Sequence, residues 1–260
     1  MDLGLSGKRA LITGGSHGIG LAVAEVLAAE GCHVAICSRG QERLDRAERA
    51  LQAHKVEVLA LPCDVLVPED IARTTDTLLE RWGGVDILVN NVGGGGRWGK
   101  PTVEDTDERV WLEVFEKNAM AAVRFTTRLL PVMRQRKWGR VITVTSRYGR
   151  EGGGRPWFNM AKAAQTSMMK TMGIMSDLVR DGVTFNSVAP GGIWIEDTGW
   201  EAEQARDPEA FRRKMEAEFP LGRLGTTKEV AAVVAFLCSS QASLVTGAAI
   251  AVDGGESRAF

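Results

Sequence analysis

The hydrophobic and polar positions of this chain alternate between two patterns. Short apolar runs predict strands, at residues 10–12, 33–38, 56–61, 85–89, 140–145, 183–188 and 248–252. Segments with apolar residues at helical spacing predict helices, at residues 21–30, 41–53, 68–82, 107–134, 156–180 and 227–239. The strands are apolar on both faces, which favours a parallel sheet covered by helices on each side. We therefore expect an α/β fold with one doubly wound, parallel, seven-stranded sheet.

The alternation runs along the whole chain without an internal repeat or a low-complexity linker. We expect one domain over residues 1–260, because a single doubly wound sheet can use a chain of this length. A charged stretch of helical character, residues 196–219, interrupts the alternation. We interpret this stretch as a helical insertion that forms a lid over a substrate. The alternative is a surface helix pair with no gating role.

The first predicted strand ends in a glycine-rich turn, Thr13-Gly14-Gly15-Ser16-His17-Gly18-Ile19-Gly20, which precedes an alanine-rich helix. This arrangement sets the N-terminus of a helix against a phosphate, and the glycines allow the backbone to approach a pyrophosphate closely. An ordinary strand-to-helix turn is the alternative. The residues that we expect to bind a cofactor here are Gly14, Ser16, His17, Gly18, Ile19 and Gly20.

Further motifs follow the later strands in a fixed order. They are Asp64, Asn90-Asn91-Val92-Gly93, Asn118, Ser146, Lys162, Asn186-Ser187-Val188-Ala189-Pro190-Gly191 and Thr246-Gly247…Val252-Asp253-Gly254-Gly255. With the glycine turn, this series resembles the short-chain dehydrogenase/reductase family over essentially the whole length. The resemblance implies a Rossmann fold, a nicotinamide cofactor, chemistry on a carbonyl/alcohol pair and a homotetramer. It also implies cofactor contacts from Asp64, Val65, Asn91, Gly93, Lys162, Pro190, Gly191 and Ile193.

The end of the second predicted strand, Ser38-Arg39, indicates which cofactor is bound. A carboxylate at this point would bind the ribose hydroxyls of NAD, whereas an arginine suits the extra phosphate of NADP. Ser38 can hydrogen-bond a phosphate and Arg39 can pair with it through its planar guanidinium. We therefore expect NADP(H). The alternative is that Arg39 is a solvated loop residue.

The family resemblance also implies a catalytic set, with one departure from the family pattern. Asn118, Ser146 and Lys162 match, but Phe158 stands where the family has the tyrosine of its Tyr-x-x-x-Lys motif. In the family that tyrosine is the general acid/base, and a positioned general acid contributes about 10²- to 10⁴-fold in rate. Phenylalanine has no O–H group and cannot move a proton.

Three accounts of this departure stay open. Tyr148, the one tyrosine in the chain, follows Ser146 by two residues and is a candidate proton donor; otherwise it is a partly exposed loop aromatic. The phenylalanine is alternatively an engineered change that inactivates the enzyme to trap a complex. In the third account the protein is a non-catalytic NADP(H)-binding sensor or partner-binding protein.

Arginines gather on two of the loops that follow predicted strands. They are Arg97, Arg147, Arg150 and Arg155. Guanidinium groups bind carboxylates and phosphates, so this cluster predicts an anionic group on a small-molecule substrate. The alternative is a set of solvated loop charges.

Composition narrows the choice of partners. A formal net charge of -1 gives no reason to expect a nucleic-acid partner, and the longest apolar stretch, residues 231–238, is too short to span a bilayer. The N-terminal residues show no signal-peptide pattern. The four cysteines have no Cys-x-x-Cys spacing and the three histidines no metal-ligand spacing. We expect a cytoplasmic protein with reduced cysteines, no metal site and no membrane partner.

Overall fold

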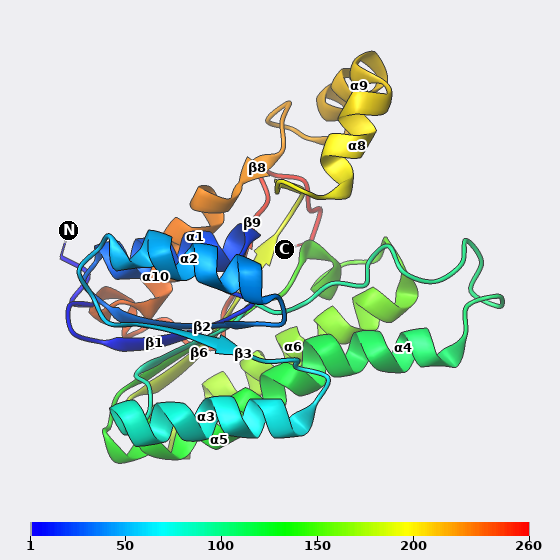
Figure 1. The fold of residues 1–260 in the computed structure, drawn as a ribbon. Coiled ribbons are helices and arrows are strands. Elements are labelled where there is room, and N and C mark those ends of the chain that lie inside the picture. The colour runs from blue at the N-terminus through cyan, green and yellow to red at the C-terminus, as the bar shows by residue number, and fades with distance from the viewer. Residues whose placement is uncertain (1, 260) are drawn as a thin grey trace.

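A parallel sheet of seven strands lies at the centre of the computed structural model, which describes residues 2–259 (Figure 1). Its strands are β1 (Arg9–Thr13), β2 (His33–Ser38), β3 (Val58–Pro62), β4 (Ile87–Asn90), β5 (Gly139–Val144), β6 (Val183–Pro190) and β9 (Ala249–Val252). The order across the sheet is β3-β2-β1-β4-β5-β6-β9. This arrangement confirms the predicted doubly wound, seven-stranded parallel sheet. The strand order reverses between β1 and β4, where ligands bind in sheets of this kind.

Helices cover both faces of the sheet (Figure 1). One face carries α1 (Gly18–Ala29), α2 (Gln41–Gln52) and α10 (Thr227–Cys238). The other carries α3 (Pro68–Trp82), α5 (Ala121–Gln135) and α6 (Pro156–Ile174). In β1, Ala10 and Ile12 pack into the first helical layer and Leu11 into the second. Burial on both faces explains the continuous apolar runs of the strands.

Two helices that we expected to be continuous are interrupted. The segment predicted as one helix over residues 107–134 consists of α4 (Glu108–Phe115), a π-helical turn (Glu116–Met120) and α5. The segment predicted over residues 156–180 ends at Ile174, because Met175 is extended, and a short helix α7 (Ser176–Val179) follows. Apolar spacing predicts the helical character of both segments but does not reveal these breaks.

The charged insertion forms two helices, α8 (Gly199–Arg206) and α9 (Pro208–Glu218), which project from the body of the molecule (Figure 1). Pro208 disfavours a helical conformation at Asp207, and the Asp207 side chain caps α9 by accepting from the Ala210 amide at 2.9 Å. The insertion starts and ends at a small parallel sheet, β7 (Ile193–Trp194) and β8 (Gly225–Thr226). The pattern of apolar residues does not predict these two short strands.

Short helical turns complete the described chain. A 3-10 turn at Arg147–Gly149 follows β5, and another at Ser240–Ala242 follows α10. Within residues 2–259, no helix is both long enough and apolar enough to cross a membrane.

Candidate active site

A cavity of about 810 Å³ lies at the carboxyl ends of the strands. Its volume is within the range of small-molecule and cofactor sites. All the residues predicted as catalytic or cofactor-binding line it except Ser16, Gly20 and Asn118, whereas Arg147 is the one arginine of the predicted substrate cluster that does so. The cavity therefore brings together side chains that follow β1, β2, β3, β4, β5 and β6.

At one end of the cavity, the glycine turn lets α1 begin directly after β1. Gly14 and Gly18 have positive φ values of 66° and 57°, which favour glycine. A Cβ at Gly20 would lie 2.3 Å from the Gly14 carbonyl oxygen, so this glycine lets the helix approach the turn. No side chain caps the N-terminus of α1 at His17. Backbone N–H groups at this terminus are therefore free of side-chain caps and fit a pyrophosphate.

His17 and Ser16 contact neighbouring parts of the chain. The His17 Nε2 atom lies 2.9 Å from the Glu196 carbonyl oxygen, at the start of the helical insertion. The Ser16 hydroxyl donates to the Ser38 hydroxyl at 2.8 Å. Ser16 thereby fixes the Ser38 side chain at the end of β2, although it does not itself line the cavity.

Two cationic side chains line this end of the cavity without an ion pair to any carboxylate of residues 2–259. They are the exposed Arg39 and the partly buried Lys117. Burial lowers the pKa of the Lys117 ammonium and the positive charge of Arg39 lowers it further, although the charges of Glu113 and Asp64 raise it in part. Two cations that repel each other across a cavity fit an anionic ligand. No sequence motif indicates Lys117, which lies in the π-helical turn beside Asn118.

The ends of β1 and β4 are tied together where the strand order reverses. The Thr13 hydroxyl accepts from the Asn91 and Val92 amides at 2.9 and 3.0 Å, and the Asn91 side chain donates to the Thr13 carbonyl at 2.9 Å. A Cβ at Gly93 would lie 2.7 Å from Asn118 Oδ1 and 3.0 Å from Lys162 Nζ. The floor of the cavity is thus bare backbone at Gly93.

Asn118 lies beneath the floor of the cavity and holds it in place by hydrogen bonds. It is fully buried in the π-helical turn, a feature frequent at functional sites. Its side chain donates to the carbonyls of Val114 and Gly94 at 2.7 and 2.9 Å and accepts from the Gly94 amide at 3.2 Å. Its backbone carbonyl accepts from Gln165 on α6 at 3.0 Å. Asn118 therefore links the loop after β4 to α6.

Lys162 and Phe158 lie one helical turn apart on α6 and face the same part of the cavity. The buried Lys162 ammonium donates to the Val144 carbonyl at 3.0 Å and lies 5.7 Å from the centre of the Phe158 ring. Burial lowers the pKa of Lys162 to about 7. A phenylalanine ring accepts no classical hydrogen bond, so Phe158 does not satisfy the ammonium as a hydroxyl would.

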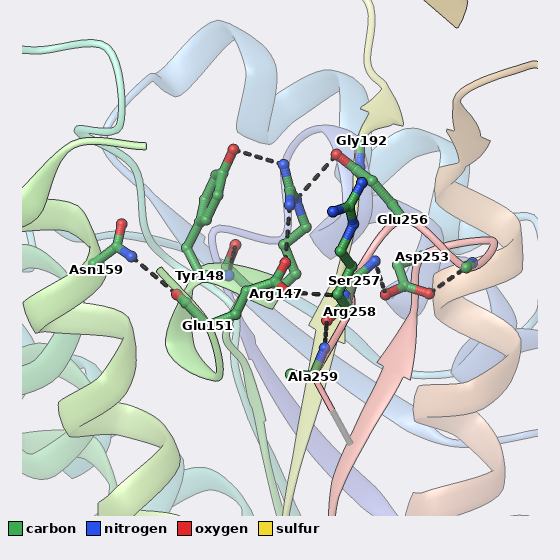
Figure 2. Close-up of polar contacts among 12 residues, drawn as sticks. Arg147, Tyr148, Glu151, Asn159, Gly192, Asp253, Glu256, Ser257, Arg258 and Ala259 are labelled. Atoms are coloured by element: carbon green, nitrogen blue, oxygen red, sulfur yellow. Dashed lines mark hydrogen bonds and ion pairs between the residues drawn. The ribbon is translucent and has the colours of Figure 1, made fainter. Parts of the chain in front are cut away.

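Ser146 and Tyr148 border the cavity at the carboxyl end of β5. The Ser146 hydroxyl accepts from the Tyr148 amide at 3.2 Å. The Tyr148 hydroxyl accepts from Arg147 Nη2 at 2.7 Å (Figure 2), because a guanidinium can only donate. The hydrogen of the Tyr148 hydroxyl is not used in this bond. Tyr148, which lines the cavity, thus keeps a hydroxyl hydrogen that Phe158 lacks.

Three of the arginines that predicted an anionic substrate already contact other groups of the protein. Arg147 pairs with Glu151 at 2.9 Å and with Glu256 at 3.0 Å. Arg155 donates to the carbonyls of Lys100 and Pro101, each at 2.8 Å. Arg97 stacks on the Trp200 ring, 5.4 Å from its centre. These guanidinium groups are engaged in structural contacts.

The C-terminal segment contributes Glu256, which the sequence analysis missed. Its carboxylate accepts from the Gly192 amide at 2.6 Å as well as from Arg147 (Figure 2). It lines the cavity together with Ser146 and Tyr148. Nothing in the local sequence around position 256 indicates this placement, since it depends on how the chain returns after β9.

Comparisons with known proteins identify relatives of this chain. A family model described as enoyl-(acyl carrier protein) reductase matches residues 14–257. The chain is 35% identical to dehydrogenase/reductase SDR family member 4 of Oryctolagus cuniculus over 253 residues, which cover 96% of this chain and 94% of that protein.

Solved structures are also similar. L-sorbose reductase from Gluconobacter frateurii, complexed with NADPH and L-sorbose, matches with a TM-score of 0.92 and 33% identity over 100% of both chains. A variant of actinorhodin polyketide ketoreductase with NADPH matches with a TM-score of 0.88 and 33% identity, over 97% of this chain and 98% of that one.

Proposed function

Since the chain belongs to the short-chain dehydrogenase/reductase family, we propose that it is an NADP(H)-dependent reductase whose proton donor is Tyr148. It is an NAD(P)-dependent oxidoreductase of carbonyl/alcohol substrates by family. To this family assignment we add three proposals: a preference for NADP(H), the identity of the proton donor and the roles of the site residues. All three rest on the side chains that line one cavity.

The glycine turn and its neighbours fit a dinucleotide. Gly14, Gly18 and the N-terminus of α1 would hold the pyrophosphate. Gly93, which has no side chain, would lie against the rings of the dinucleotide without steric conflict. Further contacts are proposed for Ile19, Asp64, Val65, Asn91, Pro190, Gly191 and Ile193. Ser38, Arg39 and Lys117 would bind the phosphate that distinguishes NADP from NAD. Two solved relatives hold NADPH, which supports this choice.

Bound NADPH supplies the hydride for the carbonyl carbon, and the chain must supply the proton. Ser146 would donate a hydrogen bond to the substrate carbonyl oxygen and orient it. The Tyr148 O–H would give its proton to that oxygen as negative charge develops there, and Arg147 would stabilise the resulting phenolate. Lys162 would hold the nicotinamide ribose. Phe158 would form an apolar wall beside the reacting carbon.

The observation that carries this proposal is that Tyr148 lines the same cavity as Ser146 and keeps its hydroxyl hydrogen, because the hydroxyl accepts from Arg147, whereas Phe158 has no hydroxyl. The test is single-turnover hydride transfer from NADPH to a panel of aldehydes and ketones, followed by cofactor absorbance. We expect transfer with at least one carbonyl compound. NADPH binding without any transfer would favour the non-catalytic alternative. Transfer that appears only in Phe158→Tyr would favour the engineered, inactive variant.

The helices α8 and α9 are proposed as a lid. His17 contacts the Glu196 carbonyl, and Arg43 on α2 pairs with Asp197 at 3.2 Å. The segment that leads into α8 thus lies against the glycine turn and α2, across the cofactor site. We also propose a homotetramer and a small polar carbonyl substrate; the L-sorbose complex of a solved relative supports the latter.

A further inference from the structure

We propose that Glu256, carried by the C-terminal segment, makes the substrate end of the cavity reject anionic carbonyl compounds and accept neutral ones that bear hydroxyl groups. This inference rests on the proposed reductase function, because it concerns the substrate of the same cavity. It reverses the expectation of an anionic substrate that the loop arginines raised.

A tight turn after β9 directs the Glu256 side chain toward Arg147 (Figure 2), and both residues line the cavity. The Asp253 carboxylate accepts from the amides of Gly255 and Ser257 at 3.0 and 3.1 Å. The Glu256 amide donates to the Asp253 carbonyl at 3.2 Å. The turn is therefore held by its own hydrogen bonds, and the position of Glu256 does not depend on a ligand.

The Glu256 side chain is built into the wall of the cavity. Only 9% of it is exposed, and each carboxylate oxygen accepts one hydrogen bond, from Arg147 or from the Gly192 amide. Burial, together with the charges of Asp253 and Glu151, raises the pKa of the Glu256 carboxyl above its usual value, although the Gly192 amide and Arg147 lower it in part. A carboxylate oxygen has a second lone pair, so both oxygens can still accept from a substrate hydroxyl.

Carboxylates outnumber the cation that they pair with at this wall. Arg147 pairs with both Glu151 and Glu256, so these three side chains together are negative. Lys214, which also lines the cavity, pairs with Glu203 at 2.6 Å. Glu218 lines the cavity as well.

An anionic substrate would therefore lose its hydration and meet like charges in a site of reduced dielectric constant. A neutral substrate with hydroxyl groups would donate hydrogen bonds to the same oxygens. Discrimination of this kind rests on a repulsive element against the wrong ligand as well as an attractive one for the right ligand.

The test uses two carbonyl compounds of equal chain length. Dihydroxyacetone is neutral, and hydroxypyruvate has a carboxylate in place of one hydroxymethyl group. Their Kd values for the protein saturated with NADPH, and their KM and kcat values, are measured in the parent and in Glu256→Gln. Comparing each compound with itself across variants cancels the different reactivities of the two carbonyls.

We expect Glu256→Gln to lower the Kd and KM of hydroxypyruvate by about tenfold, because one repulsive charge is removed. The values for dihydroxyacetone should change by less than about threefold, since glutamine retains an acceptor oxygen. Glu256→Asp, which keeps the charge, should retain the parent discrimination. Glu57→Gln removes a carboxylate that pairs with Arg81 outside the cavity and should change neither compound.

Equal changes for the two compounds in Glu256→Gln would overturn the proposal, because they would mean that Glu256 only supports the wall. Unchanged values for both would overturn it as well. If neither compound is reduced, the Kd values still test the charge selection. Failure of hydride transfer with every carbonyl compound tested would instead count against the proposed reductase function.

Discussion

Both ends of the cavity present cationic side chains, but these are unpaired at one end and paired with carboxylates at the other. At the end formed by the glycine turn, Arg39 and Lys117 have no ion pair with a carboxylate in the described chain. At the other end, Arg147 lies between Glu151 and Glu256. Arginines that look equivalent in the sequence thus differ in what they can bind. A guanidinium predicts an anionic ligand only where the fold brings no carboxylate to it.

The difference follows from the paths of the chain around the two ends. Arg39 directly follows β2 and has no ion pair in the described chain, because Asp197 of the segment that leads into α8 pairs with Arg43 on α2 instead. Arg147 begins a 3-10 turn, has Glu151 one helical turn further on, and meets the C-terminal segment that follows β9. The end formed by the glycine turn is therefore suited to bind a phosphate. At the other end, the ion pairs of Arg147 fix the positions of neighbouring side chains.

The strongest test of the substrate end is Tyr148→Phe. The change removes the O–H group but keeps the ring over Arg147 and beside Gly153. If Tyr148 donates the proton, single-turnover hydride transfer should slow by about 10²- to 10⁴-fold, with the Kd of NADPH unchanged. An unaltered rate would exclude Tyr148 as the donor. The ion-paired Arg147 at the substrate end would then have no role in proton transfer.

Phe158→Tyr is the matched control for this loss. It adds a phenol one helical turn from Lys162, so in the Tyr148→Phe background it should restore most of the lost rate. In the parent it should raise the rate by less than about tenfold, because a donor is already present. A rise of several orders of magnitude in the parent would indicate that the site lacks a working donor.

The glycine-turn end is tested by Arg39→Gln. A charge-assisted hydrogen bond contributes about 1.5–3 kcal/mol, so the Kd of NADPH should rise by about 10- to 100-fold. The Kd of NADH should change by less than about threefold, since NADH has no phosphate for Arg39 to bind. Calorimetry with both cofactors measures the two effects. Arg46→Gln, on the exposed side of α2, is the control and should leave both values unchanged.

Similar losses for NADPH and NADH in Arg39→Gln would contradict the proposed phosphate site. Tighter binding of NADH than of NADPH by the parent would contradict it more directly. Either outcome would remove the contrast between an unpaired and a paired cation on which the comparison depends.

Lys162 offers a test at the junction between the two ends. Its pKa of about 7 in the free protein reflects burial. At about pH 8 the amine is then mostly neutral, and the nearby anionic dinucleotide should favour the ammonium form. Binding should therefore take up a fraction of a proton, and the uptake should disappear as the pH falls below 7, where the free protein already carries that proton.

Calorimetry at about pH 8, in buffers of different ionisation enthalpy, measures this uptake. The pH lies above the second pKa of a phosphate monoester, about 6, so the cofactor itself contributes little. Lys162→Met should bind NADPH without the uptake. Equal uptake in Lys162→Met would assign the proton to another group.

Much of the arrangement is predictable from the sequence because short-range rules determine it. Parallel strands place the loops at their carboxyl ends along one edge of the sheet, so Gly18, Arg39 and Ser146 were expected at a common site. Helical periodicity likewise sets Phe158 and Lys162 on one face of α6. Their positions along the cavity agree with these expectations, whereas their roles stay predictions.

The features that the sequence did not predict depend on contacts between distant segments or on small backbone changes. Glu256 reaches Arg147 only through the turn after β9. The π-helical turn that buries Asn118 and sets Lys117 beside the cavity interrupts a helix whose apolar spacing looks continuous. The small sheet of β7 and β8 consists of two short pairs that no periodicity can reveal.

The smallest expected effect concerns Arg155, an arginine that the sequence alone made a candidate for substrate binding. Because it donates to the Lys100 and Pro101 carbonyls, Arg155→Gln should lower the free energy of unfolding by about 1 kcal/mol. The KM of hydroxypyruvate should stay within about threefold of the parent value, because this guanidinium already donates its hydrogen bonds to the loop after β4. Denaturant unfolding and steady-state kinetics measure the two quantities. A large rise in that KM with unchanged stability would mean that Arg155 leaves the loop to bind an anion, and the substrate end would then resemble the glycine-turn end.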